Sequence, residues 1–313
     1  MKKILTFSIL LLAFLKPLFA QQEPQYTLYM LNPFLINPAI AGTYDYYQIR
    51  TNHRFQWTGL KDAPVTNSIS AFGPHSKKPL GFGGSIYNDI TGPTSQTGIN
   101  GVCAYNYQVS TEIKVSGGLQ LGLMQYKVDG TKITTHDEVT DPVLGKEVYT
   151  SLLPDASFGV YAYATSFYGG ISVQHLFYNK FHLSNTDTAG NRLRLHYNLI
   201  GGYRYDITGR GEWILEPCLI LKKVVSTPYQ FELNAKLIYN DMIWGGFSYR
   251  TQDAFSIVLG YTYQKRIFVG YSYDLSMNDL RKYSIGSHEV VIGYNFDALK
   301  KAKKKSGKNS KKR

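Results

Sequence analysis

Beyond its first twenty residues, the 313-residue sequence has no apolar run long enough to cross a membrane as a helix. A spanning helix needs roughly 18 or more consecutive apolar residues. Only helices and closed barrels satisfy all of their backbone hydrogen bonds inside lipid. Any membrane-spanning part of this chain must therefore consist of strands.

Cysteine is scarce, with two in the chain. Residues that alternate along a strand share a face, and Cys103 falls on the face of Ile99 and Tyr105, whereas Cys218 falls on that of Glu216. Side chains on opposite faces cannot be bridged, so no disulfide is expected. We expect two free, buried small residues, without a metal-ligand spacing.

Catalytic motifs are absent. There is no Gly-x-Ser-x-Gly, Cys-x-x-Cys, His-x-x-x-His or phosphate-binding loop. A lipid-modifying enzyme would need a histidine on the lipid side, and His53, on the face of Ile49 and Trp57, is the candidate. A place in the interfacial aromatic girdle explains this histidine better, since no base-to-nucleophile spacing supports catalysis. We expect a protein that is not an enzyme and that has neither a cofactor nor a metal.

The net charge of +12 comes from the two ends of the chain. Of the 34 basic residues, three lie in the first twenty positions and nine lie in the segment 300–313, so 22 remain against 22 acidic residues. The body of the chain is neutral. Because no basic groove is left in the folded part, nucleic acid is excluded as a partner.

The chain begins with a secretory signal. Lys2 and Lys3 precede the apolar run 4–15, and Ala20 precedes Gln21, which is the pattern of a signal peptide cleaved after Ala20. An uncleaved anchor is the alternative. No cysteine follows the run, so a lipid-anchored mature terminus is not indicated.

Apolar and polar residues alternate through the rest of the chain. Phe255, Leu259 and Tyr263 fall on one face of a segment, and Ser256 and Thr262 fall on the other. A soluble sandwich would bury the apolar face against a second sheet, whereas aromatic-capped apolar faces on every strand suit lipid. We expect an all-β fold, a transmembrane antiparallel up-and-down β-barrel of about fourteen strands. The expected strands are 44–57, 66–73, 80–89, 97–108, 111–127, 156–164, 167–176, 192–206, 213–223, 230–239, 243–252, 255–264, 266–275 and 288–296.

An even number of strands places both ends of the barrel on one side of the membrane. The connections after odd strands are expected to be long and those after even strands short, except at Asp253. Bacterial barrels have short periplasmic turns and long external loops. We therefore expect an outer-membrane location with both termini in the periplasm, and Asp89 and Glu289 at the extracellular side.

The inward faces of these strands carry charges of both signs. Lone charges in a dry interior cost too much, so these groups either pair with each other around water or form a selectivity constriction for small ions. The charged and polar residues expected on the inward faces are Arg50, Arg54, Gln56, Lys114, Gln120, Arg194, His196, Arg204, Asp206, Glu216, Glu232, Lys236, Arg250 and Asp274.

The expected organisation is a signal peptide (1–20), an N-terminal periplasmic segment or plug (21–43), an outer-membrane barrel (44–296) and a Lys-rich disordered tail (297–313). The segment 21–43 lacks strand alternation and carries apolar residues that need a surface to bury against. A plug or partner contact and a plain cap beneath the barrel rim are both consistent with it. The tail is either solvated or in contact with acidic lipid head groups or an acidic periplasmic partner.

Four sequence blocks carry a resemblance to a known family. The first runs from Gln25-Tyr26-Thr27 through Asn32-Pro33 to Asn37-Pro38-Ala39-Ile40-Ala41-Gly42. The second is Arg54-Phe55-Gln56-Trp57-Thr58-Gly59, and the third ends in Asn88-Asp89-Ile90-Thr91-Gly92-Pro93. The fourth is Ser287-His288-Glu289 leading into Gly293-Tyr294-Asn295-Phe296. Together they span the mature chain, which resembles the PorP/SprF family of outer-membrane proteins.

The resemblance implies a component of the type IX secretion system that anchors or accepts a secreted surface protein, an adhesin or its C-terminal domain, and that is linked to gliding motility. It also implies a periplasmic peptidoglycan-associated partner, other type IX components and membrane lipid as contacts. The alternative function is a general diffusion porin for small solutes.

The candidate partner-binding or motif residues come from these four blocks. We expect Asn37, Pro38, Trp57, Asp89, His288 and Glu289 to shape the functional ends. A tight-turn role also explains Asn88, Asp89 and Gly92, and a strand-start hydrogen-bond pair also explains His288 and Glu289. The full set is Gln25, Tyr26, Asn32, Pro33, Asn37, Pro38, Gly42, Arg54, Gln56, Trp57, Asn88, Asp89, Ser287, His288 and Glu289.

Overall fold

The computed structural model describes residues 24–133, 147–180, 192–225 and 227–297. The predicted signal peptide and, apart from Asp297, the predicted Lys-rich tail lie outside the described residues. Among the described residues, no helix is long and apolar enough to span a membrane.

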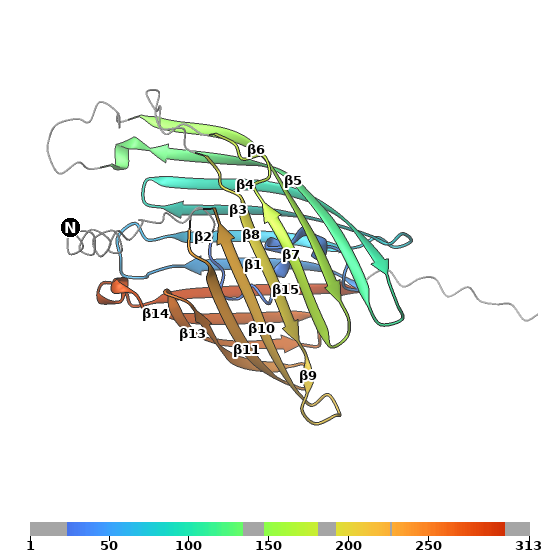
Figure 1. The fold of residues 1–313 in the computed structure, drawn as a ribbon. Coiled ribbons are helices and arrows are strands. Elements are labelled where there is room, and N and C mark those ends of the chain that lie inside the picture. The colour runs from blue at the N-terminus through green and yellow to red at the C-terminus, as the bar shows by residue number, and fades with distance from the viewer. Residues whose placement is uncertain (1–23, 134–146, 181–191, 226, 298–313) are drawn as a thin grey trace, which may run out of the picture.

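The described strands form one antiparallel sheet that closes on itself (Figure 1). Neighbours in sequence pair in order, β1 pairs with β15, and β10 pairs with β11, so no edge is left open. The strands are β1 (Tyr46–Phe55), β2 (Val65–Pro74), β3 (Leu80–Thr91), β4 (Thr94–Gln108), β5 (Lys114–Asp129), β6 (Val148–Tyr163), β7 (Phe167–Gln174), β8 (His196–Tyr203), β9 (Tyr205–Asp206), β10 (Trp213–Val224), β11 (Gln230–Tyr239), β12 (Ile243–Arg250), β13 (Ala254–Tyr263), β14 (Ile267–Ser276) and β15 (Ser287–Asp297).

The fifteen labelled strands make a barrel of fourteen. β8 and β9 both pair with β10 in one continuous register, as the pairs Cys218↔Gly202 and Leu215↔Tyr205 show, and only Arg204 interrupts them. The predicted strand 192–206 corresponds to this interrupted strand. The fold class, an outer-membrane type of antiparallel barrel with fourteen strands, is confirmed.

Two expected long connections are shorter in the structure. Thr91 pairs with Thr94, so β3 and β4 join through Gly92-Pro93 alone, with Gly92 at φ +55°. β5 continues to Asp129, beyond the predicted strand end at 127. β6 begins at Val148, before the predicted strand start at 156, so the connection between them is shorter than expected. The expected alternation of long and short connections is therefore wrong at β3–β4, whereas the exception expected at Asp253 is present as the short connection 251–253.

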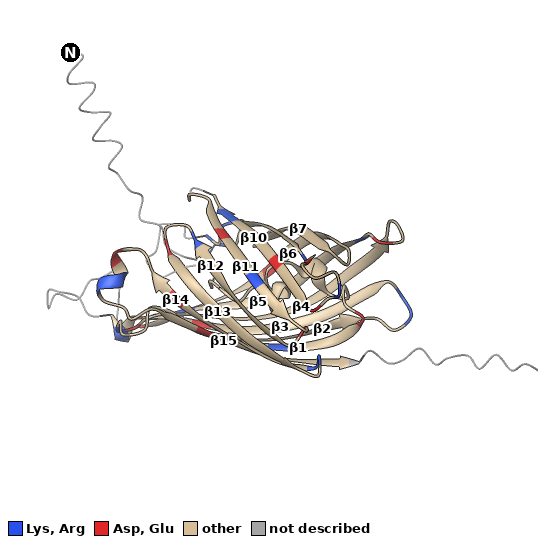
Figure 2. Cartoon of the chain, turned by 90° about the horizontal axis from the view of Figure 1, so that it is seen from below, with Lys and Arg blue, Asp and Glu red and all other residues tan. Residues whose placement is uncertain are grey.

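The apolar face of the wall points outward. Leu259 is 53 % exposed and Val269 is 43 % exposed, whereas Ser256 and Ser272 on the other face are buried. Most of the wall is uncharged, as the tan strands of Figure 2 show. Closure with an apolar exterior excludes the soluble sandwich and suits a hydrocarbon environment.

The two cysteines are free, and one of them is not where it was expected. Cys218 is buried inside, but Cys103 lies exposed on the outer wall. The prediction that both are buried was wrong for Cys103, because the apolar face to which it belongs faces outward from the barrel.

The barrel has two mouths. We call the end that carries the connections 56–64 and 277–286 the loop mouth, and a short helix, η4 (Asp279–Lys282), lies in the second of these connections. A further short helix, η3 (Gly130–Lys132), follows β5 at the same end. We call the other end, with the connection 75–79 and the paired ends Tyr46 and Asp297, the turn mouth.

Residues 24–43, which we call the luminal strap, cross the barrel from the loop mouth to the turn mouth. Gln25 hydrogen bonds to Gln230 at the beginning of β11, on the loop side. Gly42 lies against Gly81 at the beginning of β3, on the turn side. Two short helices interrupt the strap, η1 (Pro33–Leu35) and η2 (Pro38–Ile40).

Apolar side chains of the strap form the core of the molecule. Leu28, Tyr29, Phe34 and Ile40 are almost completely buried, and burial of a leucine, isoleucine or phenylalanine side chain contributes about 1.5–3 kcal/mol. The ring of Phe34 stacks on Phe72 of β2 with centroids 4.3 Å apart. The strap therefore belongs to the folded core.

Glycines let the strap approach the wall closely. An added Cβ at Gly118 would lie 2.4 Å from the amide nitrogen of Ala39, and one at Gly81 would lie 2.1 Å from the carbonyl oxygen of Ala41. A side chain at either position would push the strap away. By contrast, a Cβ at Gly117 would meet nothing within 4 Å.

These adjacent glycines provide a matched test of strap packing. We expect Gly118→Ala to lower the free energy of unfolding by about 1–3 kcal/mol, because overpacking must displace the strap. Gly117→Ala should change it little. The measurement is the unfolding midpoint of the purified barrel in detergent, and equal midpoints for the two variants would contradict the close approach of η2 to β5.

Candidate functional site

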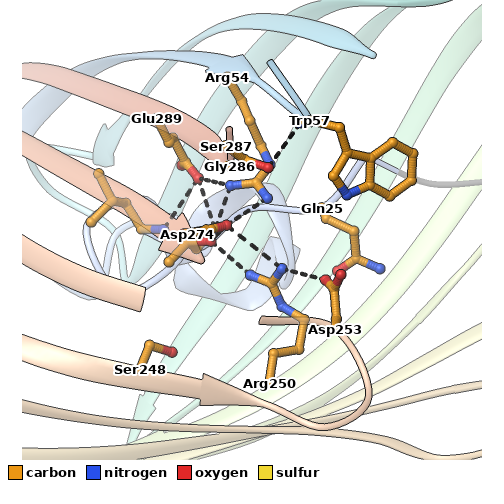
Figure 3. A network of polar contacts seen from close by, with 12 residues as sticks. Gln25, Arg54, Trp57, Ser248, Arg250, Asp253, Asp274, Gly286, Ser287 and Glu289 are labelled. Carbon is orange, nitrogen blue, oxygen red and sulfur yellow. Dashed lines mark hydrogen bonds and ion pairs between the residues drawn. The ribbon is translucent and has the colours of Figure 1, made fainter. Parts of the chain in front are cut away.

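A cluster of buried charges near the loop mouth holds the start of the strap (Figure 3). We call Thr27, Arg54, Arg250, Asp274 and Glu289 the luminal latch. The four charged residues come from β1, β12, β14 and β15, and all five are 1 % exposed or less.

Thr27 is the centre of the latch because its hydroxyl uses its full hydrogen-bonding capacity. The hydroxyl donates to Asp274 Oδ2 at 2.7 Å. It accepts from Arg54 Nη1 at 3.0 Å and from Arg250 Nη2 at 2.7 Å. A threonine hydroxyl has one donor and two acceptor sites, so this side chain joins both guanidinium groups to a carboxylate.

The backbone of the strap joins the same cluster. The Thr27 amide donates to Glu289 Oε2 at 2.7 Å, and the Leu28 amide donates to the same oxygen at 3.4 Å. Arg54 also reaches Asp274 at 2.7 Å and Glu289 at 3.2 Å. Charge-assisted hydrogen bonds of this kind are about twice as strong as neutral ones.

Strand register places the charges opposite each other. Arg54 pairs directly with Glu289 across β1 and β15, the first and last strands of the chain. Arg250 pairs directly with Glu232 across β11 and β12, with 2.8 Å between Nε and Oε2, and also lies 2.8 Å from Asp253. Opposite charges in such positions stabilise a sheet.

The strap offsets an imbalance within this cluster. Four carboxyl groups, Asp274, Glu289, Glu232 and Asp253, surround two guanidinium groups. Buried charges are tolerated when additional hydrogen bonds satisfy them. The hydroxyl and amide groups of Thr27 are such donors, so the latch is complete only with the strap in place.

The predicted inward charges are largely paired in the structure. In addition to the latch, Lys236 lies 3.5 Å from Glu216. The guanidinium carbon of Arg50 lies 4.1 Å from the ring centroid of Phe268, and Arg50 Nε donates a hydrogen bond to the carbonyl oxygen of Leu31. Arg194, Arg204 and Asp206 are exposed near strand ends and do not belong to this interior network.

The strap residues predicted from the sequence lie in the lumen and contact the wall. Asn32 donates to Asn52 at 2.8 Å and to Ser70 at 3.0 Å. Asn37 caps η2 through the Ala39 amide and also donates to the carbonyl of Val160 on β6. Pro33 and Pro38 begin η1 and η2.

The ends of the strap are also predicted residues. Gln25 lies at the loop mouth, and Tyr26 is buried in the core beside it. Gly42 has φ +76°, and a Cβ there would lie 2.6 Å from the Cα of Gly81, so its lack of a side chain is required by both conformation and space.

The second and fourth sequence blocks meet at the seam between β1 and β15. Arg54 and Glu289 enter the latch, and Gln56, which follows Arg54 closely along the chain, is also buried. The Trp57 amide donates to Ser287 Oγ at 3.0 Å (Figure 3). The structure therefore brings these predicted residues together.

His288 and Glu289 do not form the strand-start hydrogen-bond pair that was one interpretation of the sequence. They are neighbours on a strand and point to opposite faces. His288 Nδ1 lies 2.7 Å from the Tyr271 hydroxyl on the outside, whereas Glu289 lies inside.

Asn88 and Asp89 lie apart from the latch. Asn88 donates to Thr97 on β4, and Asp89 accepts from Thr66 on β2. Both belong to β3, and the turn itself is formed by Gly92-Pro93, so the tight-turn interpretation holds for Gly92 alone.

The set of candidate residues predicted from the sequence missed Thr27, Asn52 and the latch role of Arg250 and Asp274. Arg250 and Asp274 had been assigned to the inward phase. Thr27 stands in the first sequence block but was not chosen as a candidate, because a lone threonine next to Tyr26 does not indicate an ionic cluster.

A cavity of about 360 Å³ opens beside the start of the strap at the loop mouth. Its floor includes strap residues, and its wall comes from β7, β8, β10, β11 and the connections after β10 and β12. The lining residues are Pro24, Gln25, Tyr26, Leu35, Ile36, Gln174, His196, Asn198, Lys222, Val224, Thr227, Pro228, Tyr229, Gln230, Thr251, Gln252 and Asp253.

Within the described ranges, no group of three or more His, Cys, Asp and Glu side chains could hold a metal ion. The chemistry that the site does offer is ionic and hydrogen-bonding, directed at the strap.

The latch leads to a test of Thr27. We expect Thr27→Val to destabilise the barrel by about 1–3 kcal/mol, since three buried polar groups lose their shared partner. Thr27→Ser should restore most of the loss. Thr51→Val on the outer face is the control, and a Thr27→Val midpoint equal to that of the control would show that the hydroxyl does not hold the strap.

Comparison with known proteins assigns the family. No curated protein matches the chain. The fold is similar to a FadL homologue of Pseudomonas aeruginosa (11 % identity over 84 % of this chain and 93 % of that chain, TM-score 0.47). It is also similar to Omp33 of Acinetobacter baumannii (10 % identity over 81 % of this chain and 99 % of that chain, TM-score 0.44). A further similar structure is the toluene transporter TodX of Pseudomonas putida (9 % identity over 86 % of this chain and 94 % of that chain, TM-score 0.46). The model of the type IX secretion system membrane proteins PorP/SprF matches residues 18–294, and the chain belongs to this family.

Proposed function

We propose that this barrel anchors or accepts a secreted surface protein, an adhesin or its C-terminal domain, at the outer membrane, in a role linked to gliding motility. Family membership supports a place among the components of the type IX secretion system. The observation that carries the proposal is the luminal strap, which fills the interior that a diffusion channel would leave open.

The diffusion porin is the second candidate, and the packing of the strap argues against it. Fourteen strands enclose a space too wide for the side chains of the wall alone to fill. Here Leu28, Tyr29, Phe34 and Ile40 fill that space, and the latch fixes the segment at one end. A barrel whose lumen is occupied in this way is suited to holding a partner at its mouth.

The orientation we propose follows the connections. The loop mouth carries the longer connections and faces the cell exterior, and the turn mouth faces the periplasm. Tyr46, the first residue of β1, and Asp297, the last residue of β15, then lie on the periplasmic side, where a peptidoglycan-associated partner would meet them. Pro24 lies at the opposite mouth. In this orientation the strap does not begin in the periplasm, which differs from the expectation of a periplasmic N-terminal segment.

We propose no catalytic role. His53, the candidate for a lipid-modifying enzyme, lies on the outer face with Nδ1 2.7 Å from the side-chain oxygen of Asn67. An amide oxygen is not a nucleophile that a histidine activates.

Single-channel recording separates an anchor from a porin. We expect the purified barrel in planar bilayers to show no stable wide pore, and deletion of residues 24–42 to raise the conductance at least several-fold, because the lumen then fills with water. Gly118→Leu, which displaces the strap without shortening the chain, should show intermittent openings. A wild-type conductance that equals that of the deletion variant would reject the filled lumen.

Surface retention tests the anchoring role in cells. In a strain without this protein, we expect at least one type IX secreted protein to move from the cell surface to the medium. Expression of the wild-type barrel should return it to the surface. An unchanged distribution of every surface protein in the two strains would contradict the proposal.

A further inference from the structure

A further cavity, of about 370 Å³, lies at the turn mouth. The connection 75–79 lines one side of it, and the ends of β4, β5 and β6 line the other. Gly42, the end of the strap, also contributes to the lining. A volume of this size accommodates a small ligand or a lipid head group and excludes a folded domain.

The charged residues that line this cavity are two lysines, Lys78 and Lys114. Asp45 and Glu112, which belong to adjoining segments, do not line it. Within the part of the chain that the structure describes, no ion pair joins either lysine to a carboxylate. The lining therefore favours an anion.

Local hydrogen bonds fix the connection that carries Lys78. The Nδ1 atom of His75 accepts from the amides of Lys77 and Lys78, each at 3.1 Å. The amide of Asn106 donates to the carbonyl oxygen of Pro79 at 2.7 Å, which holds the connection against the end of β4. Lys78 thus projects from a defined turn beside β4.

The second lysine lies beside an aromatic ring that is itself held in place. The ammonium nitrogen of Lys114 is 6.0 Å from the ring centroid of Tyr163, within reach of a cation–π interaction. The Tyr163 hydroxyl donates to Asn106 Oδ1 at 3.1 Å, and Asn106 Nδ2 donates to the carbonyl oxygen of Ala41 at 3.2 Å. The end of the strap therefore supports the inner side of the cavity.

The outer side of the cavity belongs to the lipid-facing wall. Tyr105 and Tyr107 of β4 line the cavity and are 52 % and 59 % exposed. Tyrosines are enriched where a membrane protein passes from hydrocarbon to head groups, because the ring is apolar and the hydroxyl is polar. The cavity thus lies at the height of the lipid head groups and is open to them.

An apolar notch adjoins the cavity on the outer wall. Gly117 of β5 pairs with Tyr105 on one side and with Val160 on the other. A Cβ at Gly117 would meet nothing within 4 Å, so this position leaves open space between its neighbours. Leu119, the next outward residue of β5, is 47 % exposed and continues the apolar surface.

We propose that the cavity and the notch together bind one anionic phospholipid. Its phosphate lies between Lys78 and Lys114 and takes a hydrogen bond from a tyrosine hydroxyl at the rim, and one acyl chain follows the outer wall past Gly117. The proposed orientation places this lipid in the periplasmic leaflet. A free phosphate ion shares the chemistry of the head group but leaves the notch empty, so the acyl chain distinguishes the two.

A natural cysteine provides the reporter for this site. Cys103 is exposed on the outer wall, two residues from Tyr105 and opposite Leu119, whereas Cys218 is buried. The purified full-length barrel, labelled at Cys103 with a fluorophore, is reconstituted into phosphatidylcholine vesicles. Brominated phosphatidylglycerol should quench the label at a mole fraction at least about fivefold lower than brominated phosphatidylcholine, since one lysine near an anionic head group supplies about this factor.

Charge variants test the head-group contact. The double variant Lys78→Gln with Lys114→Gln should abolish the preference for phosphatidylglycerol, and Lys78→Arg with Lys114→Arg should keep it. The matched control is Lys77→Gln with Lys265→Gln, which removes two charges from the same mouth outside the cavity and should also keep the preference. Equal quenching by the two lipids in the wild-type protein, or an equal loss in both glutamine variants, would overturn the proposal.

Two further measurements separate a lipid from a free anion. Gly117→Leu fills the notch and should reduce quenching by phosphatidylglycerol to the level of phosphatidylcholine, whereas Gly169→Leu on the outer face of β7 should not. Inorganic phosphate should displace no more lipid than chloride at equal ionic strength. Displacement by phosphate alone, or an unchanged preference in Gly117→Leu, would refute a bound lipid. No surface protein takes part in these measurements, so their failure is distinct from that of the anchoring role.

Discussion

A closed sheet with an apolar exterior has a polar interior, and the rest of this structure depends on how that interior is satisfied. The wall turns charged residues from β1, β11, β12, β14 and β15 toward one another, and carboxyl groups outnumber guanidinium groups among them. The strap supplies the missing donors through Thr27 and fills the remaining space with apolar side chains. The luminal strap thus both fills the lumen and balances its charges.

The latch lies where the barrel closes. Arg54 and Glu289 face each other across β1 and β15, so the contact between the two terminal strands and the contact with the strap share the same side chains. Removing one member of such a buried group leaves an uncompensated charge, which costs more than the pair itself contributes. Closure of the wall and seating of the strap are for this reason expected to occur together.

The barrel could be predicted from the sequence because strand alternation is a local property. Phe255, Leu259 and Tyr263 indicate an outward face by their spacing alone, and fourteen such segments account for the closed sheet. The strap could be predicted only as a segment that needs burial. Its path depends on glycines such as Gly81 and Gly118, whose role is visible only when distant strands are brought together. The role of Thr27 could not be predicted for the same reason, because its partners lie more than 200 residues away at Asp274 and Arg250.

Hydrogen exchange of the strap tests the central claim most directly. The amides of Leu31, Asn32, Ile36, Ile40 and Ala41 are hydrogen bonded within the strap, and those of Thr27 and Leu28 to Glu289. In the purified barrel, peptic fragments covering 27–41 should exchange as slowly as those covering β13 (Ala254–Tyr263). Exchange as fast as in the connection 75–79 would show that the strap does not occupy the lumen.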